Sequence, residues 1–165
     1  MNPPMSSPKN YPMELSKQIL HFLNHQGFVI VSTMDGEGRI HCSAKGVLAL
    51  TAEARILIID LYLRQTYRNL QRDGRMSITA VDESSFKGYT LQGRGLIIPR
   101  EDITAEVLNQ WEEQIAQRIS RRIVHGVRSA SKSSAHFEAQ LPVQPQYLIE
   151  LEVERIIDLS PPSLR

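Results

Sequence analysis

The chain has 165 residues, of which 41% are hydrophobic, and this length suits one compact domain with its own core. Its 19 lysines and arginines nearly balance 18 acidic residues, which excludes a general electrostatic attraction to nucleic acid or to an anionic membrane. The single cysteine, Cys42, excludes an internal disulfide and a tetrathiolate zinc site. We therefore expect a cytoplasmic protein with no membrane and no nucleic acid among its partners.

The two ends of the chain differ in composition from the part between them. The first twelve residues carry four prolines among polar neighbours and lack the apolar run of a signal peptide. We expect residues 1–12 to be a flexible tail, residues 13–160 to form a single domain, and residues 161–165 to be a second tail. The longest apolar stretch, around residues 47–63, contains charged residues and is too short to span a bilayer.

Six segments show the β-branched, alternating or continuously apolar patterns of strands, with turn residues between them. They are residues 28–34, 39–50, 56–63, 76–82, 89–98 and 147–159. Gly93 and Gly95 interrupt the fifth segment, and glycines inside a strand often mark a bulge or a close backbone approach. Cys42 lies in mid-strand, where a small buried hydrophobic side chain is the expected role.

Three further segments carry apolar residues at helical spacing. They are residues 15–23, 66–74 and 102–124. Gly27 is placed to end the first helix in a left-handed conformation. The third helix has apolar residues at four-residue steps, including Trp111, with acidic residues early and arginines late, as its dipole favours. We expect its Trp111 stripe to pack on the strands.

The order of these elements is helix, three strands, short helix, two strands, long helix and final strand. Reversing connections with little βαβ alternation favour an antiparallel barrel over a doubly wound sheet. The predicted fold class is therefore mainly β, a six-stranded antiparallel split β-barrel with Greek-key connections. It carries an N-terminal helix, a short helix after the third strand and a long helix before the last strand.

Groups suited to a phosphate gather where the third strand runs into the short helix. Backbone N–H groups at a helix start, its positive dipole end, the Thr66 hydroxyl and the Arg64 guanidinium are what a phosphomonoester needs. The same residues also fit a plain helix cap, with Arg68 as a solvated charge. Both interpretations stay open at the level of spacing alone.

Five blocks of sequence, taken in order, resemble the pyridoxamine 5′-phosphate oxidase-like FMN-binding split β-barrels. They read FVIVSTM at 28–34, DGEGR at 35–39, HCSAK at 41–45, TYRNL at 66–70 and GYTLQG at 88–93. The resemblance runs from about Leu15 to Ile98, and the final strand through Leu159 also fits. It implies FMN as the cofactor and a homodimer with flavin at the subunit interface.

The resemblance also implies which residues hold the flavin. The strand after the first hairpin lies along the isoalloxazine ring, while the end of the third strand and the short helix hold the phosphate. The implied cofactor-binding residues are Ser43, Ala44, Lys45, Leu61, Arg64, Gln65, Thr66 and Asn69. Two alternatives stay open, namely Asn69 as a structural hydrogen-bonding residue and Lys45 as a solvated charge at a strand edge.

Departures from the family pattern bear on activity. True pyridoxamine-phosphate oxidases carry Gln and Arg where this chain has Gly88 and Thr90, and a Trp and an Arg near a C-terminus that here contains no Trp. We therefore expect an FMN-dependent oxidoreductase that passes hydride or electrons between a reduced nicotinamide and a small acceptor, but not a vitamin B6 oxidase. Non-catalytic binding of flavin, deazaflavin or haem, for electron transfer or sensing, is the alternative. The sequence names no catalytic residue.

Two other groups of residues carry remoter alternatives. His21 and His25 lie one helical turn apart, which can chelate zinc, but without the zincin glutamate such pairs are more often surface residues, so we expect no metal site. A basic stripe in the 118–132 segment could contact nucleic-acid phosphates nonspecifically. It comprises Arg118, Arg121, Arg122, His125, Arg128 and Lys132. No aromatic residues interleave with these cations, and the helix dipole alone explains them.

Overall fold

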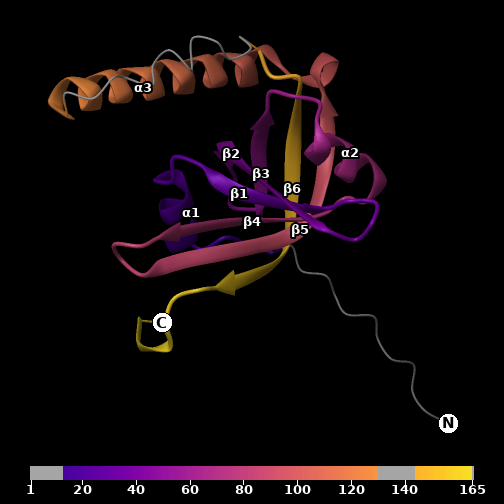
Figure 1. The fold of residues 1–165 in the computed structure, drawn as a ribbon, viewed down its shortest axis with the longest axis horizontal. Coiled ribbons are helices and arrows are strands. Elements are labelled where there is room, and N and C mark those ends of the chain that lie inside the picture. Colours follow the sequence, from indigo (N-terminus) through magenta and orange to yellow (C-terminus); the bar gives the residue numbers. More distant parts are fainter. Residues whose placement is uncertain (1–12, 130–143, 165) are drawn as a thin grey trace.

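The computed structural model describes residues 13–129 and 144–164, in which six antiparallel strands close into a barrel (Figure 1). The strands are β1 (Val29–Met34), β2 (Ile40–Leu50), β3 (Arg55–Asp60), β4 (Arg75–Asp82), β5 (Lys87–Pro99) and β6 (Tyr147–Asp158). Around the barrel their order is β1-β2-β3-β6-β5-β4, and β4 pairs again with β1. The predicted six-stranded antiparallel barrel is confirmed.

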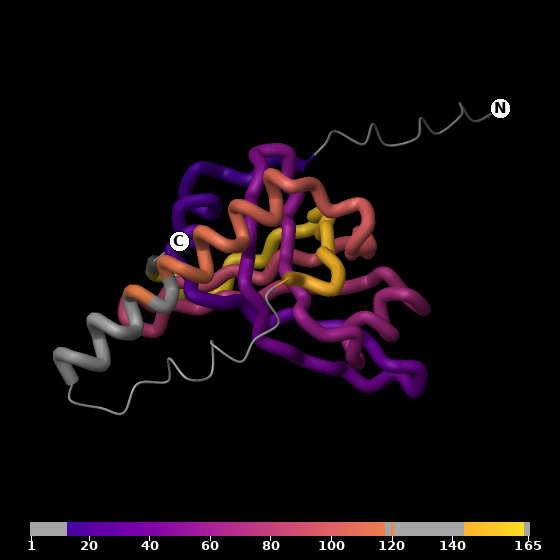
Figure 2. Tube along the Cα trace, turned by 90° about the horizontal axis from the view of Figure 1, so that it is seen from above, coloured from indigo at the N-terminus to yellow at the C-terminus, as the bar shows by residue number. Residues whose placement is uncertain are grey.

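In the described residues, three helices lie around the strands. They are α1 (Lys17–Asn24), α2 (Gln65–Arg72) and α3 (Ala105–Ser129), with short 3₁₀ turns at Arg100–Asp102 and Pro162–Leu164. In Figure 1, α1 and α2 lie on opposite sides of the barrel and α3 runs along one end of it. Seen from above, the first turns of α3 lie across the strands (Figure 2). None of the helices in the described ranges is long and apolar enough to cross a membrane.

Two apolar clusters hold this architecture together. Alternate strand residues fill the barrel interior, because successive side chains of a strand face opposite sides. Its fully buried side chains include Val31, Ile56, Ile58, Ile78, Leu91 and Ile149. A smaller cluster outside the barrel joins Trp111 of α3 to Leu48, Ile59, Ile103 and Leu148. The apolar stripe of α3 therefore packs on the strands, as predicted.

β5 changes its register against β6 between Gln92 and Gly93. A Cβ atom at position 93 would lie 1.9 Å from the carbonyl oxygen of Glu152, so a side chain there would collide with the neighbouring backbone. The prediction that a glycine in this strand marks a bulge or a close backbone approach is confirmed by the close approach at Gly93, which lies opposite a bulge whose extra residue, Glu154, belongs to β6.

The end of α1 differs from the prediction. Gly27 does not adopt a left-handed conformation, and α1 ends at Asn24, with His25 still in the right-handed helical region. The His25 backbone N–H donates to the Phe22 carbonyl at 3.2 Å, and His25 Nδ1 lies 2.7 Å from the His21 carbonyl oxygen. These contacts give partners to two of the last carbonyls of the helix, those of His21 and Phe22, without a left-handed glycine.

β3 is shorter than predicted, because it ends at Asp60 rather than at Leu63. The Asp60 carboxylate accepts a hydrogen bond from the Tyr62 backbone N–H at 3.2 Å. Such a side-chain turn offers the backbone an alternative to the sheet ladder. The apolar residues after Asp60 therefore leave the sheet and lead into α2.

α3 spans Ala105–Ser129 rather than residues 102–124. The Thr104 hydroxyl accepts the Val107 backbone N–H at 3.4 Å, so the helix begins after this capping threonine. The basic side chains of the 118–132 stripe lie outside the described residues, and the nucleic-acid alternative based on them stays an untested prediction.

Cys42 is exposed, which contradicts the expectation of a buried residue. In β1 the side chains of Val31 and Thr33 are both buried, so Ser32 between them faces outward, and Cys42 is the partner of Ser32 in β2. Its Sγ lies 3.4 Å from Ser32 Oγ on the outer surface. Paired residues of neighbouring strands share one face, and the pairing with Ser32 decides which face Cys42 occupies.

Candidate functional site

The predicted site residues of two separate segments meet where α2 lies against the barrel. Ser43 and Lys45 pair with the buried Val31 and Val29, and therefore face the interior. Thr66 in the first turn of α2 is buried, and its Oγ1 shares a hydrogen bond of 3.1 Å with Ser43 Oγ. The strand predicted to lie along the flavin ring and the helix predicted to hold its phosphate are thus in contact.

The start of α2 has backbone N–H groups without acceptors inside the helix. Its first backbone bond runs from the Arg68 N–H to the Arg64 carbonyl at 3.2 Å, so the N–H groups of Gln65, Thr66 and Tyr67 precede the ladder. Arg64 at the N-cap makes no side-chain capping bond, as expected of a side chain that has no acceptor. These N–H groups and the helix dipole favour an anion at this end.

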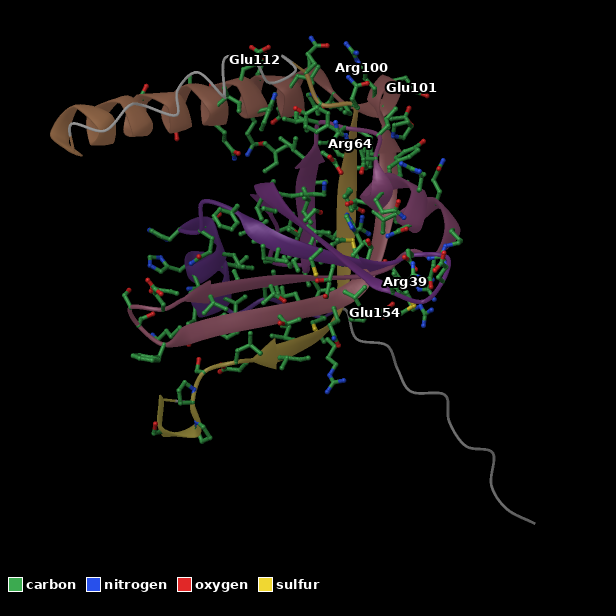
Figure 3. All side chains as sticks on the ribbon, viewed as in Figure 1. Arg39, Arg64, Arg100, Glu101, Glu112 and Glu154 are labelled. Atoms are coloured by element: carbon green, nitrogen blue, oxygen red, sulfur yellow. The ribbon has the colours of Figure 1, made fainter. Side chains whose placement is uncertain are left out.

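Arg64 places a positive charge beside this helix start. Its side chain is exposed, and its guanidinium carbon lies 5.0 Å from the centre of the Tyr62 ring. Figure 3 labels Arg64. A guanidinium over an aromatic face is attracted by the negative charge of the ring face. Arg64 is therefore both oriented and open to a ligand from the solvent side.

Both polar atoms of the Asn69 side-chain amide form hydrogen bonds within the protein. Its Nδ2 donates to Thr33 Oγ1 at 2.9 Å, and its Oδ1 accepts from Gln65 Nε2 at 2.7 Å. The side chain is only 2% exposed and ties α2 to β1. This geometry supports the structural role for Asn69, while ligand contacts by Asn69 and Gln65 stay predictions.

Lys45 is not a solvated charge at a strand edge. It forms an ion pair with Asp60, and the two side chains are 10% and 6% exposed. The Tyr147 hydroxyl donates to the same carboxylate oxygen, Oδ2 of Asp60, at 2.5 Å. Burial, together with this hydrogen bond, raises the pKa of Tyr147, so the phenol keeps its proton. Tyr67 of α2 packs edge-on against Tyr147, with 4.9 Å between ring centres.

Asp60 and Tyr147 are the residues of this site that sequence reasoning missed. The sequence did contain a signal that Asp60 has a charged partner, because an acidic residue in an apolar strand is rarely buried unless it is paired. Its partner became visible only in the sheet, where Gly46 pairs with Ile59 and so places Lys45 beside Asp60. No local pattern marks Tyr147, which lies 87 residues from Asp60.

Two predicted site residues have side chains that point elsewhere. Ala44 faces the outer surface, because its partner in β1 is the exposed Ile30. Leu61 follows β3 and packs at the edge of the cluster that contains Trp111. The structure therefore brings together Ser43, Lys45 and Thr66, with Arg64 and Gln65 at the start of the same helix and Asn69 one turn further along. It does not bring the side chains of Ala44 and Leu61 to this place.

The donors at this end of the barrel fit the phosphate of FMN. The hydroxyls of Ser43 and Thr66, the first N–H groups of α2 and the Arg64 guanidinium are the donor types that hold phosphomonoesters.

Metal ligands do not gather in the described part of the chain, where no three His, Cys, Asp or Glu side chains group together. His21 and His25 lie with ring centres 4.2 Å apart on the exposed side of α1.

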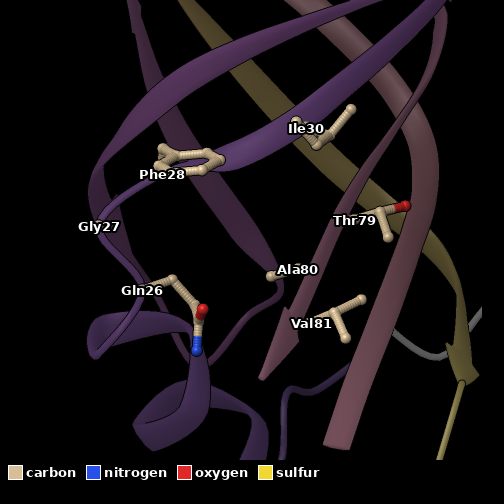
Figure 4. A pocket seen from close by; sticks show the side chains of 7 residues that line it. All are labelled: Gln26, Gly27, Phe28, Ile30, Thr79, Ala80 and Val81. Atoms are coloured by element: carbon tan, nitrogen blue, oxygen red, sulfur yellow. The ribbon is translucent and has the colours of Figure 1, made fainter. Parts of the chain in front are cut away.

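A second surface feature is an apolar groove beside the end of α1, between β1 and β4 (Figure 4). It has a volume of about 370 Å³ and is lined by Gln26, Gly27, Phe28, Ile30, Thr79, Ala80 and Val81. Phe28, Ile30 and Val81 are 61%, 36% and 60% exposed, and the lining contains no charged residue. The groove therefore presents apolar surface to the solvent.

Comparison with known proteins agrees with this architecture. The family model described as pyridoxamine 5′-phosphate oxidase matches residues 15–159. A search of curated proteins finds no significant match. Among solved structures, HupZ of Group A Streptococcus superposes with a TM-score of 0.61 at 18% identity, over 88% of this chain and 94% of HupZ.

Two further solved structures share the fold with lower TM-scores. A pyridoxamine 5′-phosphate oxidase-related, FMN-binding protein of Nostoc punctiforme has a TM-score of 0.52 at 15% identity, over 84% of this chain and 78% of that one. The heme storage protein HutZ of Vibrio cholerae has a TM-score of 0.51 at 18% identity, over 88% of this chain and 94% of HutZ. Because the family model covers most of its length, this chain belongs to the pyridoxamine 5′-phosphate oxidase family.

Proposed function

We propose that this protein binds FMN and works as a cytoplasmic oxidoreductase that passes hydride or electrons between a reduced nicotinamide and a small acceptor. The observation that carries the proposal is the hydrogen bond between Ser43 and Thr66 beside the uncapped start of α2. Membership of a family with FMN-binding relatives supports it. FMN supplies the redox chemistry when bound, and the protein supplies its placement.

The residues of the site have different parts in this proposal. Thr66, Ser43 and the first N–H groups of α2 bind the phosphate, and Arg64 neutralises it from the solvent side. Asn69 positions α2 through its bond to Thr33. The backbone of residues 43–45 would line the flavin ring.

Replacing Arg64 with Gln and Thr66 with Ala in one variant should weaken FMN binding at least about tenfold, because a charge-assisted contact and a hydroxyl donor are lost. Quenching of FMN fluorescence measures the affinity, and circular dichroism checks the fold. The matched control is Arg94→Gln, which removes an exposed arginine of β5 paired with Glu154. Native affinity in the double variant would refute the phosphate site.

The visible absorption spectrum separates FMN from haem as the bound group. We expect two oxidised-flavin bands on addition of FMN, whereas a Soret band after addition of haem, with no flavin binding, would favour the haem alternative. Consumption of reduced nicotinamide by the FMN-loaded protein would support an enzyme. Inactivity with several acceptors would favour a carrier or sensor.

We also propose that the protein is a homodimer with the flavin at the subunit interface. The uncharged groove with exposed Phe28, Ile30 and Val81 supports this, because contiguous apolar surface on a small domain marks an interaction site. A second copy that covers the groove would remove this surface from water.

A further inference from the structure

The candidate site contains a buried cation whose charge is already cancelled. Lys45 and Asp60 pair on the inner side of the barrel, where both side chains are almost fully buried. Asp60 Oδ2 receives the Lys45 ammonium and the Tyr147 hydroxyl, and Oδ1 accepts the Tyr62 backbone N–H. The carboxylate therefore has the partners that a buried charge needs, and all of them come from the protein.

This ion pair borders the proposed phosphate site. Lys45 and Ser43 lie two residues apart on the same face of β2, a separation of about 6.6 Å along a strand. Ser43 contacts Thr66, and the next residue of α2, Tyr67, packs on the Tyr147 ring. At such distances and away from bulk water, a change of one unit in the charge of the pair acts strongly on a bound anion.

We propose that Asp60 sets the affinity of this site for phosphomonoesters by cancelling the charge of Lys45, so that affinity follows the net charge of the pair. The inference rests on the proposed phosphate site. In the native protein the pair is neutral, and the hydroxyls, the N–H groups and Arg64 bind the phosphate. Asp60 thus acts through Lys45 as a positioning residue and limits how tightly a phosphate dianion is held.

Four proteins that differ in the net charge of the Lys45–Asp60 pair test this proposal. The native pair has a net charge of 0, Asp60→Asn gives +1, and Lys45→Met gives −1. The double variant of this series, which carries both Asp60→Asn and Lys45→Met, returns to 0. We expect Asp60→Asn to bind FMN and inorganic phosphate about tenfold more tightly, Lys45→Met about tenfold more weakly, and the double variant like the native protein. Riboflavin, which lacks the phosphate, should change in affinity much less than FMN across the four proteins, because only the backbone of residues 43–45 would line its ring. Fluorescence quenching measures both flavins, and calorimetry measures inorganic phosphate.

The control is Glu150→Gln, which removes a carboxylate that pairs with the exposed Arg55 on the outside of β3 and β6, and it should leave all affinities unchanged. If Asp60→Asn does not fold because Lys45 loses its partner, the comparison of Lys45→Met with the double variant still decides, since recovery of FMN affinity in the latter supports the proposal.

Equal FMN affinities across the series, or riboflavin affinities that shift in parallel with those for FMN, would overturn the role of Asp60 while leaving the phosphate site intact. A native protein that binds neither FMN nor inorganic phosphate would overturn the proposed function, and this inference with it. The two failures are therefore distinguishable in one set of titrations.

Discussion

At Gly93, β5 passes so close to β6 that the position has no room for a side chain. The nearest atoms to an added Cβ belong to the backbone of Glu152, which moves only if the strand moves. The register shift at this point leaves Glu154 as an extra residue in β6, and such a bulge bends the strand as the barrel closes. A single glycine is therefore a requirement of the barrel's shape.

Gly93→Ala should lower the free energy of unfolding by about 2–3 kcal/mol, because the new methyl group overpacks a site bounded by backbone. Urea unfolding followed by circular dichroism measures this. Gly36→Ala is the control, since no atom lies within 4 Å of its added Cβ, and it should change stability by less than about 0.5 kcal/mol. Equal stabilities of the two variants would contradict the role of Gly93.

Among the elements, α3 donates side-chain hydrogen bonds to the backbone of β2. The pairing of β2 with β3 shifts between Val47 and Ala49, so Leu48 lies in a bulge outside the ladder. The side chains of Gln110 and Gln114 donate to the Leu48 carbonyl at 3.2 Å and 2.9 Å. α3 thus hydrogen-bonds the backbone at the bulge that sets the register of the Lys45–Asp60 pair.

Trp111→Ala should destabilise the protein by about 3–5 kcal/mol, because it opens a cavity where α3 packs on the barrel. Circular dichroism must follow the unfolding, since Trp111 is the only tryptophan. Glu112→Ala changes the exposed neighbour of Trp111 and should alter stability by less than about 0.5 kcal/mol. Native stability in Trp111→Ala would mean that α3 is not coupled to the barrel.

At the scale of the whole molecule, the strands within residues 13–129 and 144–164 close into a barrel in which each strand pairs on both sides, so a partner of this barrel would meet its faces. The groove between β1 and β4 is such a face, and its lining is uncharged. A homodimer built on it would place apolar side chains in the interface centre, where charges are depleted.

Ile30→Lys should convert the expected dimer into a monomer, because burying an unpaired ammonium in an apolar interface is costly. Light scattering gives the mass in solution. Leu96→Lys is the matched control, since Leu96 is an exposed apolar residue of β5 outside the groove, and this variant should stay dimeric. A monomeric native protein, or a dimer that survives Ile30→Lys, would contradict this interface.

The sequence by itself determined the number, type and order of the elements, because hydrophobic periodicity, turn residues and caps are local properties of the chain. For the same reason it located Thr66 and Arg64 at the start of a helix after a buried strand. The apolar spacing around Trp111 likewise predicted the packing face of α3, which the structure confirms.

Only the tertiary structure decided which side chains meet. Continuing the pairing of Leu50 with Ile56 without the bulge would set Lys45 opposite Leu61, whereas the bulge brings it to Asp60. Cys42 was assigned to the wrong face for a related reason, since strand register decides which side of a sheet a residue occupies. Register depends on contacts between distant segments, such as the bonds from α3 to Leu48, and these are not encoded in any local pattern.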